Sequence, residues 1–94
     1  MRYFKRKWTE STGESLTAFW GTSDYYFETD DQLNVTRQLQ VFEQGQVLKY
    51  GAEFTEDDFG RLADQPLDEA EFKEHEIATG EFKNIWSSLK RAIT

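Results

Sequence analysis

The segment from Leu33 to Glu43, LNVTRQLQVFE, constrains the fold more than any other stretch of this chain. Its apolar positions are Leu33, Val35, Leu39 and Val41, and they alternate with the polar positions Asn34, Thr36, Gln38 and Gln40. Because successive side chains of a strand point to opposite faces, this period of two predicts a half-buried β-strand.

Four further segments have strand character and are joined by short turns. They are Met1–Trp8, Leu16–Trp20, Tyr25–Thr29 and Val47–Tyr50. Short links pair strands antiparallel, since parallel neighbours need a crossover of about a dozen residues. Gly45 lies in EQGQ, where a hairpin needs a positive φ. The first half of the chain therefore predicts an antiparallel meander sheet of about five strands.

The end of the chain has the period of a helix instead. The apolar residues Phe82, Ile85, Trp86, Leu89 and Ile93 fall on one face of a helix that starts near Thr79, the expected N-cap. A short extra helix is expected near 68–74, with Asp68 as its cap and Glu71 three residues on. We expect a single α+β domain, residues 1–94, in which the C-terminal amphipathic helix packs on the sheet.

The aromatic run Tyr25-Tyr26-Phe27 belongs to a predicted strand. Tyr25 and Phe27 share one face of that strand, and Tyr26 shares the other with Glu28. We expect Phe27 in the core, as is usual for phenylalanine, and Tyr26 at the surface.

The formal net charge of −7 is unevenly distributed. Eleven acidic and two basic residues between Glu53 and Glu81 give this stretch a net charge of −9, which leaves +2 for the rest of the chain. An acidic protein is disfavoured as a binder of nucleic acid or anionic membranes. The acidic stretch has two interpretations: solubility with favourable helix charge, or a surface for a cationic protein.

The N-terminus, MRYFKRKW, interleaves basic and aromatic residues. That pattern occurs on single-stranded nucleic-acid faces, but here we prefer a strand whose outer side pairs with the acidic stretch. Lys5, Arg6 and Lys7 interrupt any signal-peptide core, and no run approaches the ~20 apolar residues that span a bilayer. Together with the absence of cysteine, this favours the cytoplasm.

Patterns that carry catalysis or cofactors are scarce. His75 is the only histidine, no cysteine nucleophile exists, and we interpret His75 as solvated. The acid pairs Asp30-Asp31 and Asp57-Asp58 lack the spacing of a calcium loop, and no glycine-rich loop precedes a helix. We therefore predict no catalytic residue, no metal site and no cofactor.

Arg37 lies in register with Val35 and Leu39 on the expected buried face. A buried guanidinium needs a carboxylate partner or a wet site. Arg37 is therefore a structural partner of Glu28 or of an acid of the Asp57-Asp58 group, a side chain that snorkels out at the sheet edge, or the holder of an anionic ligand.

Several segments resemble a family of small uncharacterised bacterial proteins of about this length. The matching segments are YYFETD, VTRQLQVFEQGQVLKYG, DFGRLADQPL and GEFKNIW. The family has no established activity and is loosely associated with immunity-type proteins that neutralise secreted toxins. The resemblance implies a bacterial protein of that kind and assigns no catalytic residue.

We therefore predict a non-enzymatic cytoplasmic module that binds a basic protein and is a monomer or weak homodimer. The predicted partner-binding residues are Trp20, Tyr26, Tyr50, Asp57, Asp58 and Phe59. The alternative is a small anionic-ligand-binding protein that uses Arg37 with Tyr26 and Tyr50.

Overall fold

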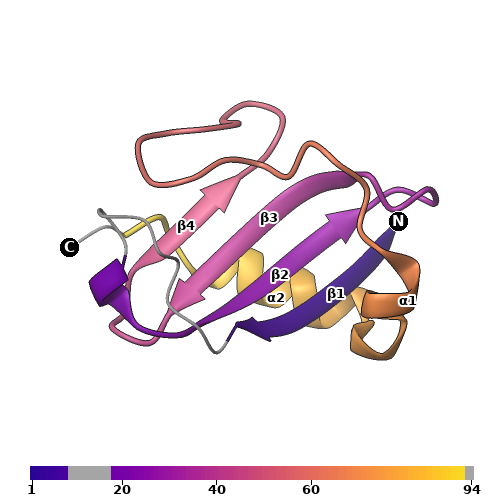
Figure 1. The fold of residues 1–94 in the computed structure, drawn as a ribbon, viewed down its shortest axis with the longest axis horizontal. Coiled ribbons are helices and arrows are strands. Elements are labelled where there is room, and N and C mark those ends of the chain that lie inside the picture. Colours follow the sequence, from indigo (N-terminus) through magenta and orange to yellow (C-terminus); the bar gives the residue numbers. More distant parts are fainter. Residues whose placement is uncertain (9–17, 93–94) are drawn as a thin grey trace.

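The computed structural model describes residues 1–8 and 18–92 (Figure 1). Its elements are β1 (Arg2–Trp8), the 3₁₀ helix η1 (Ala18–Trp20), β2 (Ser23–Thr29), β3 (Val35–Phe42), β4 (Val47–Tyr50), α1 (Glu69–Phe72), the 3₁₀ helix η2 (Lys73–His75) and α2 (Thr79–Ser88). This composition confirms the predicted α+β class.

The strands form one antiparallel sheet in the order β1-β2-β3-β4, which is the predicted meander. Gly45 turns the β3–β4 hairpin with a φ of 99°. The described residues contain four strands of this sheet rather than about five. The strand predicted for Leu16–Trp20 is wrong where it is described, because Ala18–Trp20 forms a 3₁₀ helix; residues 16–17 lie outside the described part.

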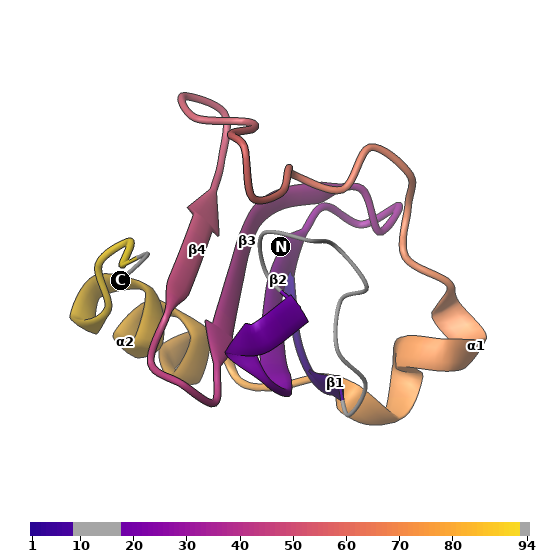
Figure 2. The ribbon, with the colours of Figure 1, turned by 60° about the vertical axis from the view of Figure 1, so that its left-hand side comes forward.

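The sheet lies between two layers, as Figure 2 shows. We call the side covered by α2 the helix face; its buried residues are Tyr3, Tyr26, Leu39 and Val47. The opposite side, the loop face, is covered by α1 and by the long connection that runs from β4 to α1. Both faces are therefore apolar, unlike a sheet with one solvated side.

Helix α2 packs on the sheet by the predicted apolar stripe. Phe82 is fully buried against Tyr3, with ring centroids 5.1 Å apart, and Ile85, Trp86 and Leu89 pack beside it. Ile93, the last predicted member of the stripe, lies outside the described residues. The helix is capped by Ala78 rather than by Thr79, and the Ala78 side chain makes no capping bond.

The shorter helix begins as predicted. The Asp68 carboxylate accepts a 3.2 Å hydrogen bond from the Glu71 amide at the start of α1. This bond satisfies one of the backbone donors that a helix N-terminus leaves free. Phe72 on the same turn is buried on the loop face.

A β-bulge divides the alternating segment that predicted β3. Glu28 pairs with Arg37, whereas the next residue of β2, Thr29, pairs with Val35, so β3 has an extra residue at Thr36. This extra residue shifts the alternation by one position. Side chains on the two sides of the bulge that a regular strand would place on the same face therefore point to opposite faces. Leu33 and Val35 therefore pack on the loop face and Leu39 on the helix face, and the prediction of one shared face is wrong.

The aromatic run on β2 is buried from both sides. Phe27 is in the loop-face core, as predicted. Tyr26 is only 7% exposed beneath α2, so the prediction of an exposed Tyr26 is wrong. Other segments of the chain cover both faces of the sheet, and the pattern of a single strand does not reveal this.

Both edge strands are partly covered by later segments. Ile77 donates a 2.8 Å hydrogen bond to the Tyr3 carbonyl at the β1 edge. Val47 and Ala92 exchange two backbone hydrogen bonds, of 2.6 and 2.9 Å, at the β4 edge. Covered edges present fewer free backbone groups for pairing with a second chain.

Candidate functional site

Asp57, one of the predicted partner-binding acids, is engaged inside the molecule. Its Oδ1 accepts hydrogen bonds from the Tyr50 hydroxyl (2.8 Å) and from the amides of Phe59 (2.8 Å) and Gly60 (3.0 Å). Its Oδ2 pairs with Arg91. Burial would raise the pKa of Asp57, but the bonds from Arg91, Tyr50 and Phe59 outweigh it and hold this pKa below its usual value. Asp57 is thus a structural residue.

Its neighbour Asp58 is exposed, as are Glu53 and Glu56 on the same connection. Phe54 lies between these acids with 45% of its surface exposed, and its ring stacks on Tyr50. An exposed aromatic side chain is of the residue type that is enriched at protein interfaces, and here the Arg91 guanidinium also lies 5.3 Å from the Phe54 ring centroid. Sequence analysis did not single out Phe54, although it lies directly between predicted residues.

The predicted aromatic anchors are mostly packed. Tyr50 is buried, which contradicts its predicted place in a partner surface. Trp20 and Phe59 are half-buried because Trp20 stacks on Phe59 and meets Phe42 edge-on. Trp20 and Phe59 therefore present only part of their rings.

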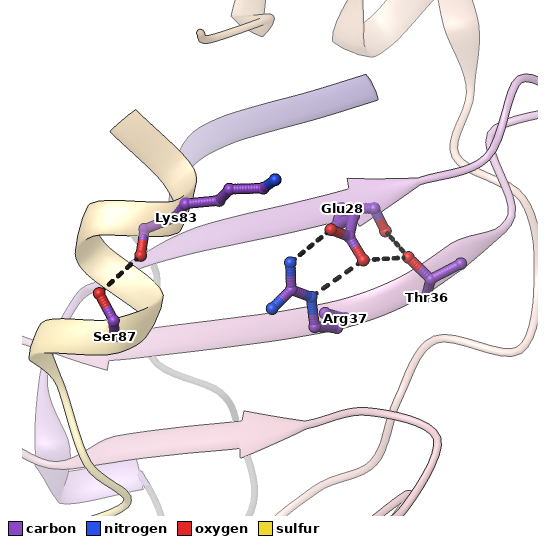
Figure 3. Close-up of polar contacts among 5 residues, drawn as sticks. All are labelled: Glu28, Thr36, Arg37, Lys83 and Ser87. Carbon is purple, nitrogen blue, oxygen red and sulfur yellow. Dashed lines mark hydrogen bonds and ion pairs between the residues drawn. The ribbon is translucent and has the colours of Figure 1, made fainter. Parts of the chain in front are cut away.

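Arg37 forms a two-pronged ion pair with Glu28 across β2 and β3, as Figure 3 shows. Its Nε and Nη2 donate to the two Glu28 oxygens at 2.9 and 2.5 Å, and Thr36 donates to the same carboxylate at 2.7 Å. The bonds from Arg37 lower the pKa of the buried Glu28. This agrees with the structural interpretation of Arg37, with Glu28 as its partner.

Arg37 also lines a groove of about 550 Å³ between the end of α2 and the turn after β4. Trp86, Phe54 and Tyr50 contribute to its walls, whereas Tyr26 does not line it and lies beneath α2. Of the three residues predicted for an anionic ligand, the structure thus brings two to one groove.

Lys49 is a functional candidate that sequence analysis missed. Its ammonium donates to the carbonyls of Trp86 (2.7 Å) and Leu89 (2.9 Å) at the end of α2 and lies 4.3 Å from the Trp86 ring centroid. Burial, and then the charge of Arg37, lower the pKa of Lys49. The only sequence signal is a lysine inside the apolar VLKY strand.

The loop face contains a second hollow, a cavity of about 340 Å³ between β1, β2 and α1. Four aromatic rings line it: Trp8, Tyr25, Phe27 and Phe72. The sequence contains part of this cavity in RYFKRKW, which predicted a strand that pairs with the acidic stretch but no aromatic cavity.

The basic N-terminal strand pairs with the acidic stretch, as expected. Arg2 pairs with Glu76 at 3.1 Å, and Arg6 pairs with Glu71. Arg61 lies 3.8 Å from Asp64 within the acidic stretch itself. Other exposed acids between 53 and 76 take part in no salt bridge within the described part of the chain; they are Glu53, Glu56, Asp58, Asp68, Glu69 and Glu74.

His75 is exposed at the end of η2, where its ring meets Phe72 edge-on. Within residues 1–8 and 18–92, no group of three or more histidines and acids is arranged to hold a metal ion. No helix in these ranges combines the length and apolar character that crossing a membrane requires.

Comparison of the chain with family models, with curated proteins and with solved structures finds no match. The resemblance to small bacterial proteins of the immunity type therefore stays a prediction, and functional inference rests on the geometry above.

Proposed function

We propose that this protein is a non-enzymatic, cytoplasmic protein-binding module whose acidic segment, residues 53–76, receives a basic partner. The observation that carries the proposal is the set of exposed acids in this segment without a salt bridge in the described structure, with Phe54 exposed among them. A basic toxin domain fits this acidic surface, and it is the kind of partner expected of an immunity-type protein.

The physical basis is electrostatic steering. A surface of one charge sign raises the association rate with a partner of the opposite sign, and it contributes more to specificity than to affinity. The affinity then depends on a few apolar anchors at the centre of the interface. Phe54 satisfies this requirement close to Glu53, Glu56 and Asp58.

The test uses matched charge variants of the full chain against a purified basic partner. The variant Glu53→Gln/Asp58→Asn neutralises two acids of the segment, and Asp31→Asn/Glu81→Gln neutralises two exposed acids elsewhere. We expect weaker binding for the first pair only, and a loss of that difference as salt rises from about 50 to about 300 mM, since screening shortens the range of charge. Equal binding by both variants would reject the proposal.

A second candidate is the predicted small anionic-ligand site. Its supporting observation is the groove in which Arg37 lies near the half-buried Lys49 beside Trp86. Arg37 is already paired with Glu28 and Lys49 is bonded to helix carbonyls, so a ligand would use their remaining N–H groups. A thermal-shift screen of anionic metabolites tests it: a stabilising compound should lose its effect in Lys49→Met, and a screen without any hit counts against the site.

A further inference from the structure

The aromatic cavity on the loop face, which we call the slot, is lined by rings in two orientations. The rings of Tyr25 and Phe27 are parallel to within 4°, with centroids 5.4 Å apart, so they are offset-stacked. Trp8 stands at 89° to Tyr25, and Phe72 stands at 88° to Phe27. A guest aromatic ring in the slot therefore has ring faces and ring edges to contact, and aromatic pairs favour offset-stacked and edge-to-face arrangements.

Two of the polar side chains that line the slot, Arg6 and Gln38, are already bonded within the protein. Arg6 pairs with Glu71, and its guanidinium lies 5.4 Å from the Phe72 ring centroid. The Gln38 amide donates to the Arg61 carbonyl (3.2 Å) and accepts from the Ala63 amide (2.9 Å). The walls thus have little polar capacity to spare, which favours an apolar guest over a polar one.

The size of the slot also limits the guest. A volume of about 340 Å³ lies at the lower end of the ~300–1,000 Å³ typical of ligand pockets. One aromatic side chain matches this volume better than a large cofactor does. Trp8 is 41% exposed, so the slot is open to the solvent at that side.

The charges next to the slot indicate which residues of a partner would flank the guest ring. Phe72 belongs to α1, and the exposed acids Asp68, Glu69 and Glu74 lie on or next to that helix. These acids form no salt bridge in the described residues, whereas the two arginines that line the slot each face an acid: Arg6 pairs with Glu71, and Arg61 lies 3.8 Å from Asp64. A ring carried on a positively charged segment therefore fits this surface better than one carried on an acid.

We infer that the slot receives an aromatic side chain of the basic partner, an inference that rests on the proposed function and adds its anchor. The exposed acids Asp68, Glu69 and Glu74, on or next to α1, then attract the basic residues on either side of that anchor. The four rings supply the apolar contact that charge alone does not give.

Three small probes with the same indole ring and different charge test the slot without a partner. They are tryptamine (cationic), indole-3-acetamide (neutral) and indole-3-acetate (anionic), and propylamine is the control without a ring. Binding to the full chain is measured by NMR through the backbone amides of Tyr25, Phe27 and Phe72, which line the slot and are retained in every variant. We expect tryptamine to bind about tenfold or more tightly than propylamine, given the energy of aromatic pairs, and about two- to fivefold more tightly than indole-3-acetate.

Two variants separate the ring contact from the charge. Trp8→Leu should weaken all three indole probes, whereas Phe54→Leu, which alters an equally exposed aromatic residue elsewhere, should weaken none. Glu69→Gln/Glu74→Gln should remove the advantage of tryptamine over indole-3-acetamide and leave the acetamide unchanged. Circular dichroism of each variant shows whether the fold is intact.

The inference is overturned if no indole probe shifts the amide signals of the slot residues, if the acetate binds more tightly than tryptamine, or if Trp8→Leu binds all probes as the wild type does. The proposed function can survive any of these results, because its own test measures partner binding by charge variants at other positions.

Discussion

The hydroxyl of Tyr50 donates a 2.8 Å hydrogen bond to Asp57, and this pair ties the end of β4 to the connection that covers the loop face. Arg91, which follows α2, pairs with the other oxygen of the same carboxylate. One side chain thereby joins the sheet, the long connection and the C-terminal segment. Its neighbour Asp58 is exposed to solvent.

Asp57→Ala should therefore destabilise the protein by about 2–3 kcal/mol, because charged hydrogen bonds and the groups they leave unpaired contribute on that scale. Asp58→Ala is the matched control and should change stability by less than about 0.5 kcal/mol. Urea unfolding curves of both variants measure the difference. Similar midpoints for the two would contradict a structural role for Asp57.

Two aromatic residues of α2, Phe82 and Trp86, differ in burial, so replacing each with alanine should lower the free energy of unfolding by different amounts. Phe82 is fully buried and Trp86 is half-buried. Phe82→Ala should lower the free energy of unfolding by about 3–5 kcal/mol, the usual cost of emptying a buried aromatic site. Trp86→Ala should lower it by less, and Asn84→Ala on the exposed side of the helix by almost nothing. Thermal unfolding gives the order, and a larger effect at Asn84 would refute the assignment of the helix face.

The ion pair of Arg37 and Glu28 should be sensitive to removal of one partner only. Arg37→Met leaves the buried Glu28 carboxylate unpaired and should cost about 2–4 kcal/mol, somewhat below the range for fully buried pairs because Arg37 is partly exposed. The double variant Glu28→Gln/Arg37→Met should recover part of this loss. A double-mutant cycle from denaturant unfolding measures the coupling, and strictly additive effects would show that the pair contributes nothing.

Lys49 should stabilise the end of α2 through the two carbonyls it contacts. Lys49→Met keeps the aliphatic stem and removes the ammonium, so it should cost about 1–2 kcal/mol and leave the carbonyls of Trp86 and Leu89 without this donor. Amide hydrogen exchange should accelerate in the last turn of α2 and not in β2. Uniform acceleration across the sheet would indicate global destabilisation instead.

Acid should weaken the fold through carboxylates with lowered pKa values. The bonds from Arg37 lower the pKa of Glu28, and the bonds from Arg91 and Tyr50 lower that of Asp57 against the opposing effect of burial. These carboxylates therefore bind protons more readily in the unfolded chain than in the folded protein. The stabilisation from Glu28 and Asp57 is complete above their ordinary pKa values of 4.5 and 3.8, and it is lost as the pH falls below these values. Unfolding midpoints between about pH 7 and pH 2 measure this slope, which should be shallower in Arg37→Met.

Local pattern predicted most of the fold. The strand character of β3, the glycine of the β3–β4 turn and the apolar stripe of α2 each report the geometry of one element and were confirmed, although β3 is buried on both faces rather than half-buried. Predictions that depend on how a segment packs against its neighbours were wrong. Ala18–Trp20 forms a 3₁₀ helix rather than a strand, and the bulge at Thr36 divides the apolar residues of β3 between two faces.

The candidate sites were less predictable than the elements. The sequence correctly marked the acidic segment as exposed, but it treated Asp57 and Asp58 as equivalent and expected Tyr26 and Tyr50 at the surface. The aromatic slot went unrecognised because Trp8, Tyr25 and Phe72 are distant in sequence and meet only in the folded chain.

The sequence by itself determined the antiparallel meander, the amphipathic helix and the acidic character of the second half, since periodicity, turn residues and charge act between near neighbours. Only the tertiary structure decided which acid is structural, which aromatic rings are buried and where Lys49 binds. Those outcomes depend on contacts between residues far apart in the chain, such as Arg91 with Asp57, and burial and pairing at such contacts follow from the packing of whole elements.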